Sequence, residues 1–297
     1  MIKPNLFIVG AAKSGTTAMN DFLNQHPDIF MAKKELHFFG SDLNINQSTL
    51  TEQEYLDFFK EGQGKKITGE SSVWYLFSKK AAAEIKAFSS DAKIIIMLRN
   101  PVEMMRALHQ QNIYDGNEDI AGFEEAVLAV TDRKNGRRLP KSPEHLSCLL
   151  YLDAVKYYKQ VKRYFDVFGK ENVCVIIYDD FKSDNSEVYR YVLNFLQVDT
   201  TFEPVYDIIN PYKEVGNIAV HQFIKHPPNK LREMVRMAIP YKPLRHFFMD
   251  TISRWNVKTS ERQPINEQFK KKLQEEVAED VMQLSKLLQT DLTFWLK

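Results

Sequence analysis

Four short apolar runs along the chain each end where a polar turn or a helical pattern begins. They span residues 6–10 (LFIVG), 65–70 (KKITGE), 93–100 (KIIIMLRN) and 172–180 (NVCVIIYDD). Each run has the length of a buried strand, and the chain between successive runs is long enough for the crossover that parallel strands need. The alternation predicts an α/β fold in which a central parallel sheet is flanked by helices on both faces.

Two longer segments carry apolar residues at helical spacing. One runs from Glu144 to Phe168, with Gly169 placed to cap it, and the other is an amphipathic pattern from Asn266 to Leu288. Residues 41–52 and 131–145 are the expected loops. The sequence contains no internal repeat, and we expect a single domain over 1–297.

Residues 217–262 differ from the rest and form a basic subregion of short helices and loops. This stretch holds nine Lys or Arg against three acidic residues. A solvated surface, a basic wall over an anionic donor or acceptor, and contact with a membrane surface all remain open for it.

Composition narrows the function classes. With 44% hydrophobic residues the chain can bury a sizeable core, and its net charge of +1 gives no global attraction to nucleic acid. No apolar run approaches the ~20 residues of a membrane span, and the first strand begins too early for a signal peptide. Cys148 and Cys174 suit neither a disulfide framework nor a metal site. We therefore expect a reduced, soluble, cytoplasmic protein without a transmembrane segment.

The first apolar run leads into the sequence VGAAKSGTTAM, which has the layout of a phosphate-binding loop before a helix. Gly10, Gly15 and Thr17 keep the spacing of the Walker pattern, but its lysine position holds Thr16, and the only lysine of the loop is Lys13. This P-loop-like arrangement retains the anion-binding geometry without the lysine that grips an ATP γ-phosphate. It favours a phosphate-bearing donor other than Mg-ATP.

A second anion site is expected where the third apolar run ends. A phosphoryl-transferring P-loop enzyme would have an Asp there to hold Mg²⁺. This run ends instead in Arg99, followed by Asn100 and Pro101 at the first turn of a helix. A guanidinium beside a helix N-terminus suits a phosphate group.

Glu35 and His37 stand two residues apart in KKELHFFG, residues 33–40. On an extended segment this spacing places both side chains on one side. A carboxylate and an imidazole that converge in this way suit general-base chemistry on an acceptor hydroxyl. A strand entry without catalytic function is the alternative.

Taken together, these motifs resemble the sulfotransferases that use 3′-phosphoadenosine-5′-phosphosulfate (PAPS), especially the bacterial and glycan-modifying branch. The matching stretches are VGAAKSGTTAM, NQHPDIFMAKKELHFFG, LRNPVEMM, VIIYDDF and LLQTDLTFW, in the family's order from Leu6 to Trp295. The resemblance implies that PAPS is the donor, that 3′-phosphoadenosine 5′-phosphate (PAP) is the product, and that no metal is needed.

The resemblance also implies a role for each matching residue. Glu35 would be the base, His37 would support or orient the acceptor, and Lys13 would neutralise the oxygen that leaves the sulfuryl group. Arg99 would hold the 3′-phosphate. The 5′-phosphate would be held by Ser14, Gly15, Thr16 and Thr17.

One position departs from the family pattern. Where a serine usually follows the arginine by eight residues, this chain has Ala107, and Arg106 or His109 could compensate. Lys213 and Asn217, in INPYKEVGN, are expected contacts of the loop that covers the donor.

The acceptor is the least defined part of the prediction. The segment GESSVWYLFS, residues 69–78, matches a substrate-facing stretch of the family, and this suggests Glu70, Trp74 and Tyr75. These aromatic side chains suit stacking on a sugar or an aromatic acceptor, or packing in the core. A small molecule, a glycan and a lipid all remain possible acceptors.

Two other functions stay open. A Mg-ATP-dependent phosphotransferase would need Lys13 to act as the Walker lysine, with Glu70 or Asp179 holding Mg²⁺. A catalytically impaired protein that binds PAP or PAPS would keep the fold without turnover, and the departure at Ala107 is its support.

Overall fold

The computed structural model describes residues 2–43, 45, 50–141, 143–206, 214–215, 257–258 and 264–297. It divides into two compact units. The first unit contains residues 1–104, 154–209 and 271–297, and the second contains 105–153 and 210–270. The single domain expected over 1–297 stays a prediction.

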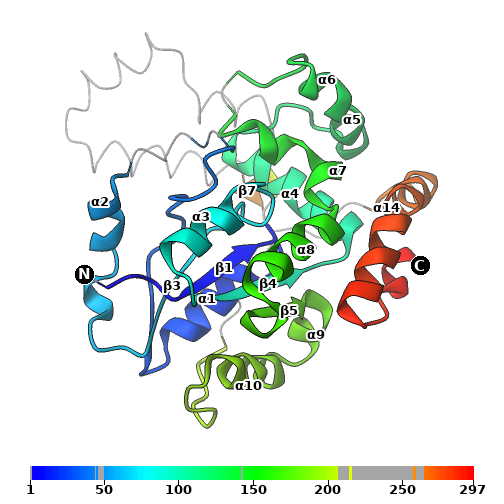
Figure 1. Ribbon diagram of the computed structural model, residues 1–297. Helices are drawn as coiled ribbons and strands as arrows, with labels where there is room; N and C mark the ends of the chain where they lie inside the picture. Colours follow the sequence, from blue (N-terminus) through cyan, green and yellow to red (C-terminus); the bar gives the residue numbers. More distant parts are fainter. Residues whose placement is uncertain are drawn as a thin grey trace, which may run out of the picture. The chain divides into compact units, whose positions relative to one another are not determined.

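The first unit is built on a five-stranded sheet (Figure 1). Its strands are β1 (Leu6–Gly10), β2 (Ile29–Met31), β3 (Ile67–Ser71), β4 (Lys93–Leu98) and β5 (Val173–Ile177). Their order is β2-β3-β1-β4-β5, and every pairing is parallel. The α/β prediction is confirmed, and four of the strands lie on the four apolar runs. The fifth, β2, was missed because three residues are too few to show a period.

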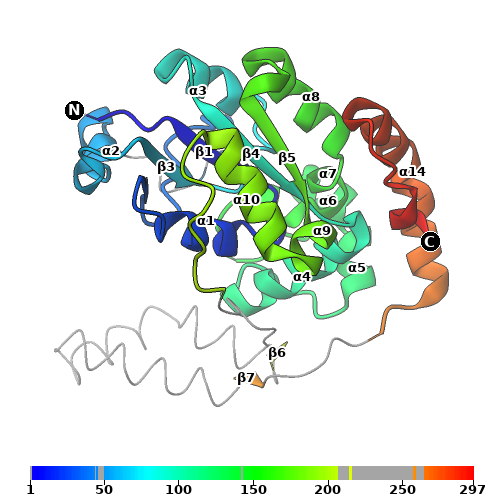
Figure 2. The ribbon, with the colours of Figure 1, turned by 90° about the horizontal axis from the view of Figure 1, so that it is seen from below.

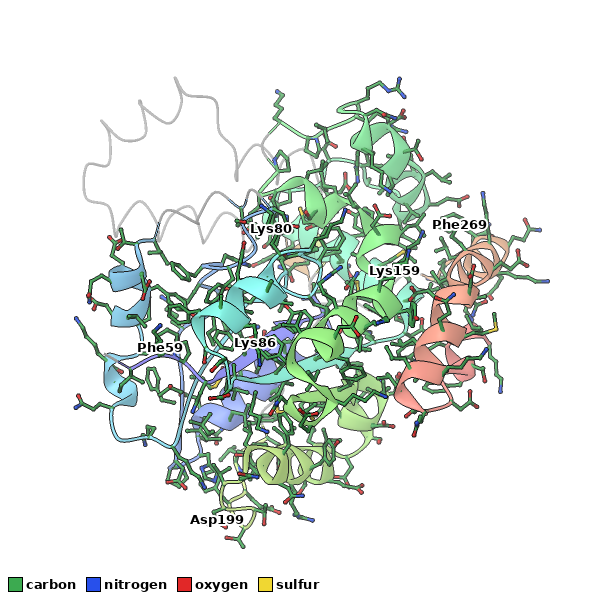
Figure 3. The ribbon with its side chains drawn as sticks, viewed as in Figure 1. Phe59, Lys80, Lys86, Lys159, Asp199 and Phe269 are labelled. Carbon is green, nitrogen blue, oxygen red and sulfur yellow. The ribbon has the colours of Figure 1, made fainter. Side chains whose placement is uncertain are left out.

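Helices cover both faces of this sheet, as expected (Figure 2). Helices α1 (Thr16–Asn24) and α10 (Asn185–Leu196) lie on one face, and α3 (Ala81–Phe88) and α8 (Tyr157–Phe168) lie on the other. On the first face, apolar side chains of β1, β4 and β5 pack with those of the two helices in one buried cluster. On the second face, the ammonium of Lys86 on α3 lies 5.3 Å from the ring centre of Phe168 on α8 (Figure 3).

The remaining elements are short, apart from two helices. The first unit also contains α2 (Glu52–Asp57), η1 (Lys60–Gly62), η3 (Lys170–Asn172), α9 (Tyr178–Ser183) and η4 (Thr293–Leu296). The second unit contains α5 (Phe123–Leu128), α6 (Val130–Lys134), η2 (Leu146–Leu149), most of α7 (Tyr151–Ala154) and the antiparallel pair β6 (Glu214–Val215) and β7 (Val257–Lys258). Two longer helices, α4 (Pro101–Asp115) and α14 (Glu267–Leu288), contribute residues to both units.

The single helix predicted over 144–168 is wrong: the segment forms η2, α7 and α8 in succession. The backbone leaves the helical conformation at Leu150 (ψ 63°) and at Lys156 (ψ 74°), and side chains bond to carbonyl groups nearby. Asn112 Nδ2 donates to the carbonyl oxygen of Cys148 at 2.8 Å, and Gln160 Nε2 donates to that of Ala154 at 3.3 Å. The predicted end is confirmed, since Gly169 has φ +80° and its N–H donates to the carbonyl of Phe165.

The bounds of two helices and one loop can be compared with those predicted from the sequence. Helix α4 begins at Pro101, as expected. Helix α14 also lies where the pattern placed it, and Asn266 Oδ1 accepts bonds from the N–H groups of Gln268 and Phe269 at its start. The loop expected over 131–145 begins later, because α6 extends to Lys134.

No helix in the described ranges is both long and apolar enough to cross a membrane. Both cysteines are free thiols in the protein interior, and burial raises the pKa of Cys148 and of Cys174 to about 12.

Candidate active site

The loop between β1 and α1 forms the first part of the site. Gly15 is the N-cap of α1 with φ +90°, and a Cβ there would lie 3.2 Å from the Tyr178 ring, so a side chain would be both strained and crowded. The first turn of α1 contains no acidic residue. The unsatisfied N–H groups of a helix start, together with its positive dipole end, favour an anion there. The residues present fit a phosphate group.

The hydroxyl groups of this loop have different surroundings. Ser14 is fully buried, and its hydroxyl donates to the carbonyl of Ala12 at 3.3 Å, so it turns into the loop itself. Thr16 and Thr17 both accept bonds from the ammonium of Lys34, at 3.2 and 3.1 Å. The threonine side chains therefore face a second cation that the sequence analysis did not identify.

Arg99 stands at the carboxyl end of β4, next to this loop. Its guanidinium donates to the carbonyl of Lys13 at 3.2 Å and lies 4.7 Å from the ring centre of Tyr178. Glu103, one turn into α4, lies 3.7 Å from the guanidinium. Arg99 therefore lies beside the loop, so the residues of the two predicted anion sites are close together.

Glu35 and His37 lie together on the non-helical segment that follows β2. His37 Nε2 is 2.9 Å from a carboxylate oxygen of Glu35, and the Lys34 ammonium is 3.9 Å from the other oxygen. His37 is buried, whereas the Glu35 side chain is 26% exposed. The carboxylate can therefore meet an acceptor while the imidazole supports it from within.

The charges around Glu35 keep it ionised. Burial alone raises the pKa of this carboxyl, but the hydrogen bond from His37 and the nearby Lys34 ammonium outweigh that effect, and the net pKa is lower than usual. Burial also lowers the pKa of Lys34, although Glu35 and Asp21 oppose the shift. At neutral pH Glu35 is a carboxylate that can accept a proton.

Residues assigned to the acceptor from sequence have internal surroundings. Glu70 and Tyr75 are 1% and 0% exposed, and their polar groups bond to the protein itself. Trp74 is 7% exposed and lines a small recess with Ala11 and Ala12 of the loop. All three side chains are thus buried, and their assignment to the acceptor stays a prediction.

The remaining predictions concern the loop over the donor and the residues that follow Arg99 on α4. Lys213 and Asn217 lie outside the described residues. Ala107 is buried on α4. His109 Nε2 is 2.9 Å from the carbonyl of Ile120, and burial lowers the pKa of the ring, so it carries no charge at neutral pH. A neutral imidazole is a weak substitute for a phosphate-binding cation.

A Mg-ATP-dependent phosphotransferase would need Asp179 or Glu70 to hold Mg²⁺, but both carboxylates accept hydrogen bonds from other side chains. Asp179 accepts a bond from the Trp295 indole, and Glu70 accepts bonds from three hydroxyl groups. Within the described part of the chain, no group of three or more His, Cys, Asp or Glu is arranged to hold a metal ion.

Sequence reasoning missed Lys34, Tyr178 and Ser72. Lys34 directly precedes Glu35, so the sequence alone places a cation next to the candidate base. The ring of Tyr178, at the end of a predicted strand, could have been paired with Arg99, because the carboxyl ends of neighbouring parallel strands meet at one edge. Ser72 Oγ accepts bonds from the N–H groups of Leu36 and His37, and no sequence pattern indicates these contacts.

Comparison with known proteins agrees with this geometry. The chain is 29% identical to a sulfotransferase from Alicyclobacillus acidocaldarius of known structure, with a TM-score of 0.73 over 100% of both chains. It is 33% identical to the heparan sulfate glucosamine 3-O-sulfotransferase 3A1 of Mus musculus over 121 residues, which are 41% of this chain and 29% of the relative. It is 31% identical to the membrane-associated sulfotransferase kil1 of Dictyostelium discoideum over 108 residues, 36% of this chain and 22% of the relative.

The matches to these two curated relatives thus span less than a third of their length. A family-wide match covers much more of the chain: residues 3–213 fit the sulfotransferase domain, and this range includes the loop, Glu35 and Arg99. The chain belongs to the sulfotransferase domain family.

Proposed function

We propose that this protein transfers the sulfuryl group of PAPS to a hydroxyl or amine acceptor, with Glu35 as the base. The observation that carries the proposal is the position of the Lys34 ammonium. It bonds to Thr16 and Thr17 of the phosphate-binding loop and lies 3.9 Å from the Glu35 carboxylate. A donor-binding loop and a candidate base thus meet at one point, as transfer between two bound substrates requires.

On the donor side, the chain supplies N–H groups, hydroxyls and three cations. The backbone of Ser14 to Thr17 and the two threonine hydroxyls would hold the 5′-phosphate, and Arg99 would hold the 3′-phosphate. Bound PAPS supplies a sulfuryl group whose bond to the bridging phosphate oxygen breaks. Lys13 would stabilise the negative charge that develops on that oxygen.

On the acceptor side, Glu35 would take the proton as the acceptor oxygen or nitrogen forms its bond to sulfur. The proton moves to the carboxylate, and PAP leaves with the electron pair of the broken bond. His37, 2.9 Å from Glu35, would hold the carboxylate in orientation. A general base of this kind contributes roughly 10²–10⁴-fold in rate.

The names of related enzymes indicate which acceptor class to test first. The heparan sulfate relatives are named for a glucosamine acceptor. We therefore place a glycan hydroxyl first, and a small molecule or lipid second. Turnover with a glucosamine-containing polysaccharide and with a simple phenol would distinguish them.

The proposal is tested by thermal unfolding with adenosine 3′,5′-bisphosphate and with ATP, each with and without Mg²⁺. A ligand that binds only the native state adds about 2.7 kcal/mol at a hundredfold excess over its Kd. We expect stabilisation by the bisphosphate without metal. Stabilisation by Mg-ATP alone would favour the phosphotransferase. Stabilisation by the bisphosphate without any turnover of PAPS would favour the impaired binding protein.

A further inference from the structure

A buried carboxylate lies beneath the segment that carries Glu35 and His37. Glu70, at position 4 of the five-residue strand β3, is 1% exposed. It accepts hydrogen bonds from Tyr55 Oη at 2.5 Å, Ser72 Oγ at 2.7 Å and Tyr75 Oη at 3.1 Å. Burial of a carboxylate is costly, so an acid at this position needs a reason.

Two of these hydroxyl groups also hold the backbone of the neighbouring segment. Ser72 Oγ accepts bonds from the N–H groups of Leu36 and His37, at 3.2 and 3.1 Å. Tyr75 Oη accepts bonds from those of Phe38 and Phe39, at 2.8 and 3.2 Å. Four successive N–H groups are thus held by only two hydroxyl oxygens.

The hydroxyl groups of Ser72 and Tyr75 both donate their protons to Glu70. A hydroxyl has one proton and two lone pairs. Because backbone N–H groups occupy the lone pairs of Ser72 and of Tyr75, each hydroxyl must donate its proton, and the acceptor within reach is Glu70. A carboxylate accepts without donating, which suits three donors at once.

A glutamine at position 70 would not accept all of these hydrogen bonds. The NH₂ group of a glutamine would face hydroxyl oxygens whose lone pairs are already used, so a donor would meet donors. The acceptor-only chemistry depends on the ionised carboxylate, since a protonated acid would add a donor of its own. Glu70 is predicted from sequence to contact the acceptor, whereas these contacts connect it to the backbone of residues 36–39.

We propose that Glu70 is a positioning residue that acts through Ser72 and Tyr75 to fix the backbone of residues 36–39, and thereby holds His37 and the adjoining Glu35 in register with the donor loop. The proposal rests on the proposed function for its catalytic consequence. Its structural half, the ordering of residues 36–39, can be measured without turnover.

The structural half is tested by amide hydrogen exchange on Glu70→Gln, Ser72→Ala and Tyr75→Phe. We expect the amides of residues 36–39 to exchange at least tenfold faster in each variant, while those of β1 keep their rate. Tyr189→Phe is the matched control, since it removes another buried tyrosine hydroxyl, which donates to the carbonyl of Phe22. Unchanged exchange at 36–39 in Ser72→Ala and Tyr75→Phe would overturn the proposal even if Glu70→Gln fails to fold.

The catalytic half is tested by separating kcat from donor binding. A misplaced catalytic segment costs about 10²-fold in rate, so we expect Glu70→Gln to lower kcat by about that factor while the Kd of adenosine 3′,5′-bisphosphate changes less than threefold. The acid limb of the pH–rate profile should also move to higher pH, because the His37 hydrogen bond that lowers the pKa of Glu35 is weakened. A lower melting temperature with unchanged kcat would show a merely structural role and overturn this half. Failure of the wild-type protein to bind the bisphosphate would instead count against the proposed function.

Discussion

The indole Nε1 of Trp295 donates a hydrogen bond of 3.1 Å to the carboxylate of Asp179. The carbonyl of the same tryptophan accepts a bond from Asn100 Nδ2 at 3.2 Å. Asn100 follows Arg99 and Asp179 follows Tyr178, so one residue of η4 ties down the chain just beyond β4 and β5. Trp295 is therefore a support for the Arg99–Tyr178 pair.

Replacement of Trp295 by Phe removes the indole donor and part of a side chain that is 1% exposed. We expect the free energy of unfolding to fall by about 1–3 kcal/mol, from one hydrogen bond and a small cavity. Urea denaturation measures this change. Phe294→Leu is the control, since Phe294 is 44% exposed, and an equal loss there would remove the special role of Trp295.

Replacement of Arg99 by Ala tests the 3′-phosphate site. A charge-assisted hydrogen bond is worth about 1.5–3 kcal/mol, or roughly 10–150-fold in Kd. Calorimetry should show this loss for adenosine 3′,5′-bisphosphate and a smaller one for adenosine 5′-phosphate. Arg190→Ala, at an exposed arginine paired with Glu203, should change neither. Equal losses for both ligands would place the 3′-phosphate elsewhere.

Replacement of Glu35 by Gln keeps the shape of the side chain and removes the base. We expect kcat to fall by roughly 10²–10⁴-fold, while the bisphosphate binds as before, because the loop and Arg99 are untouched. Steady-state kinetics and calorimetry on one preparation give both values. The exposed Glu203 provides the control variant, Glu203→Gln. Full activity of Glu35→Gln would exclude Glu35 as the base.

Replacement of Lys34 by Gln has a predictable effect on pH dependence. Lys34 lowers the pKa of Glu35, so its loss raises that pKa, and a higher pH is then needed to ionise the base. The acid limb of the pH–rate profile should move upward, and donor binding should weaken because Thr16 and Thr17 lose their cation. Lys33→Gln, one residue earlier and exposed, is the matched control. A profile that does not move would mean that Lys34 does not act on Glu35.

The second unit contains a fully buried ion pair, with Arg133 Nη2 2.7 Å from Glu118 Oε1. Tyr151 also donates to this carboxylate, at 2.8 Å. Glu118→Gln leaves a buried guanidinium without its counter-charge, so we expect about 3–5 kcal/mol of lost stability. Asp166→Asn breaks an exposed pair with Lys162 and should cost at most about 1 kcal/mol. Similar losses in the two variants would contradict this difference in burial.

Local sequence was enough for four of the five strands and for the glycine turn before α1, whereas the roles assigned to Glu35 and Arg99 stay predictions. Apolar runs of five or six residues reveal buried strands, and glycine at the N-cap of α1 is required by its own backbone angle. Local pattern failed at 144–168, where the backbone leaves the helical conformation at Leu150 and at Lys156 although the apolar spacing continues.

Tertiary structure decided which side chains act together. The apolar pattern does not show whether Glu70 lies in the interior beneath residues 36–39 or at an open acceptor site. That depends on where hydroxyls from positions 55, 72 and 75 converge. The same holds for Lys34 on Thr16 and Thr17, and for Trp295 on Asp179. Hydrogen bonds depend on distance and direction in space, and residues distant in sequence satisfy those conditions only after the sheet and its helices have brought them together.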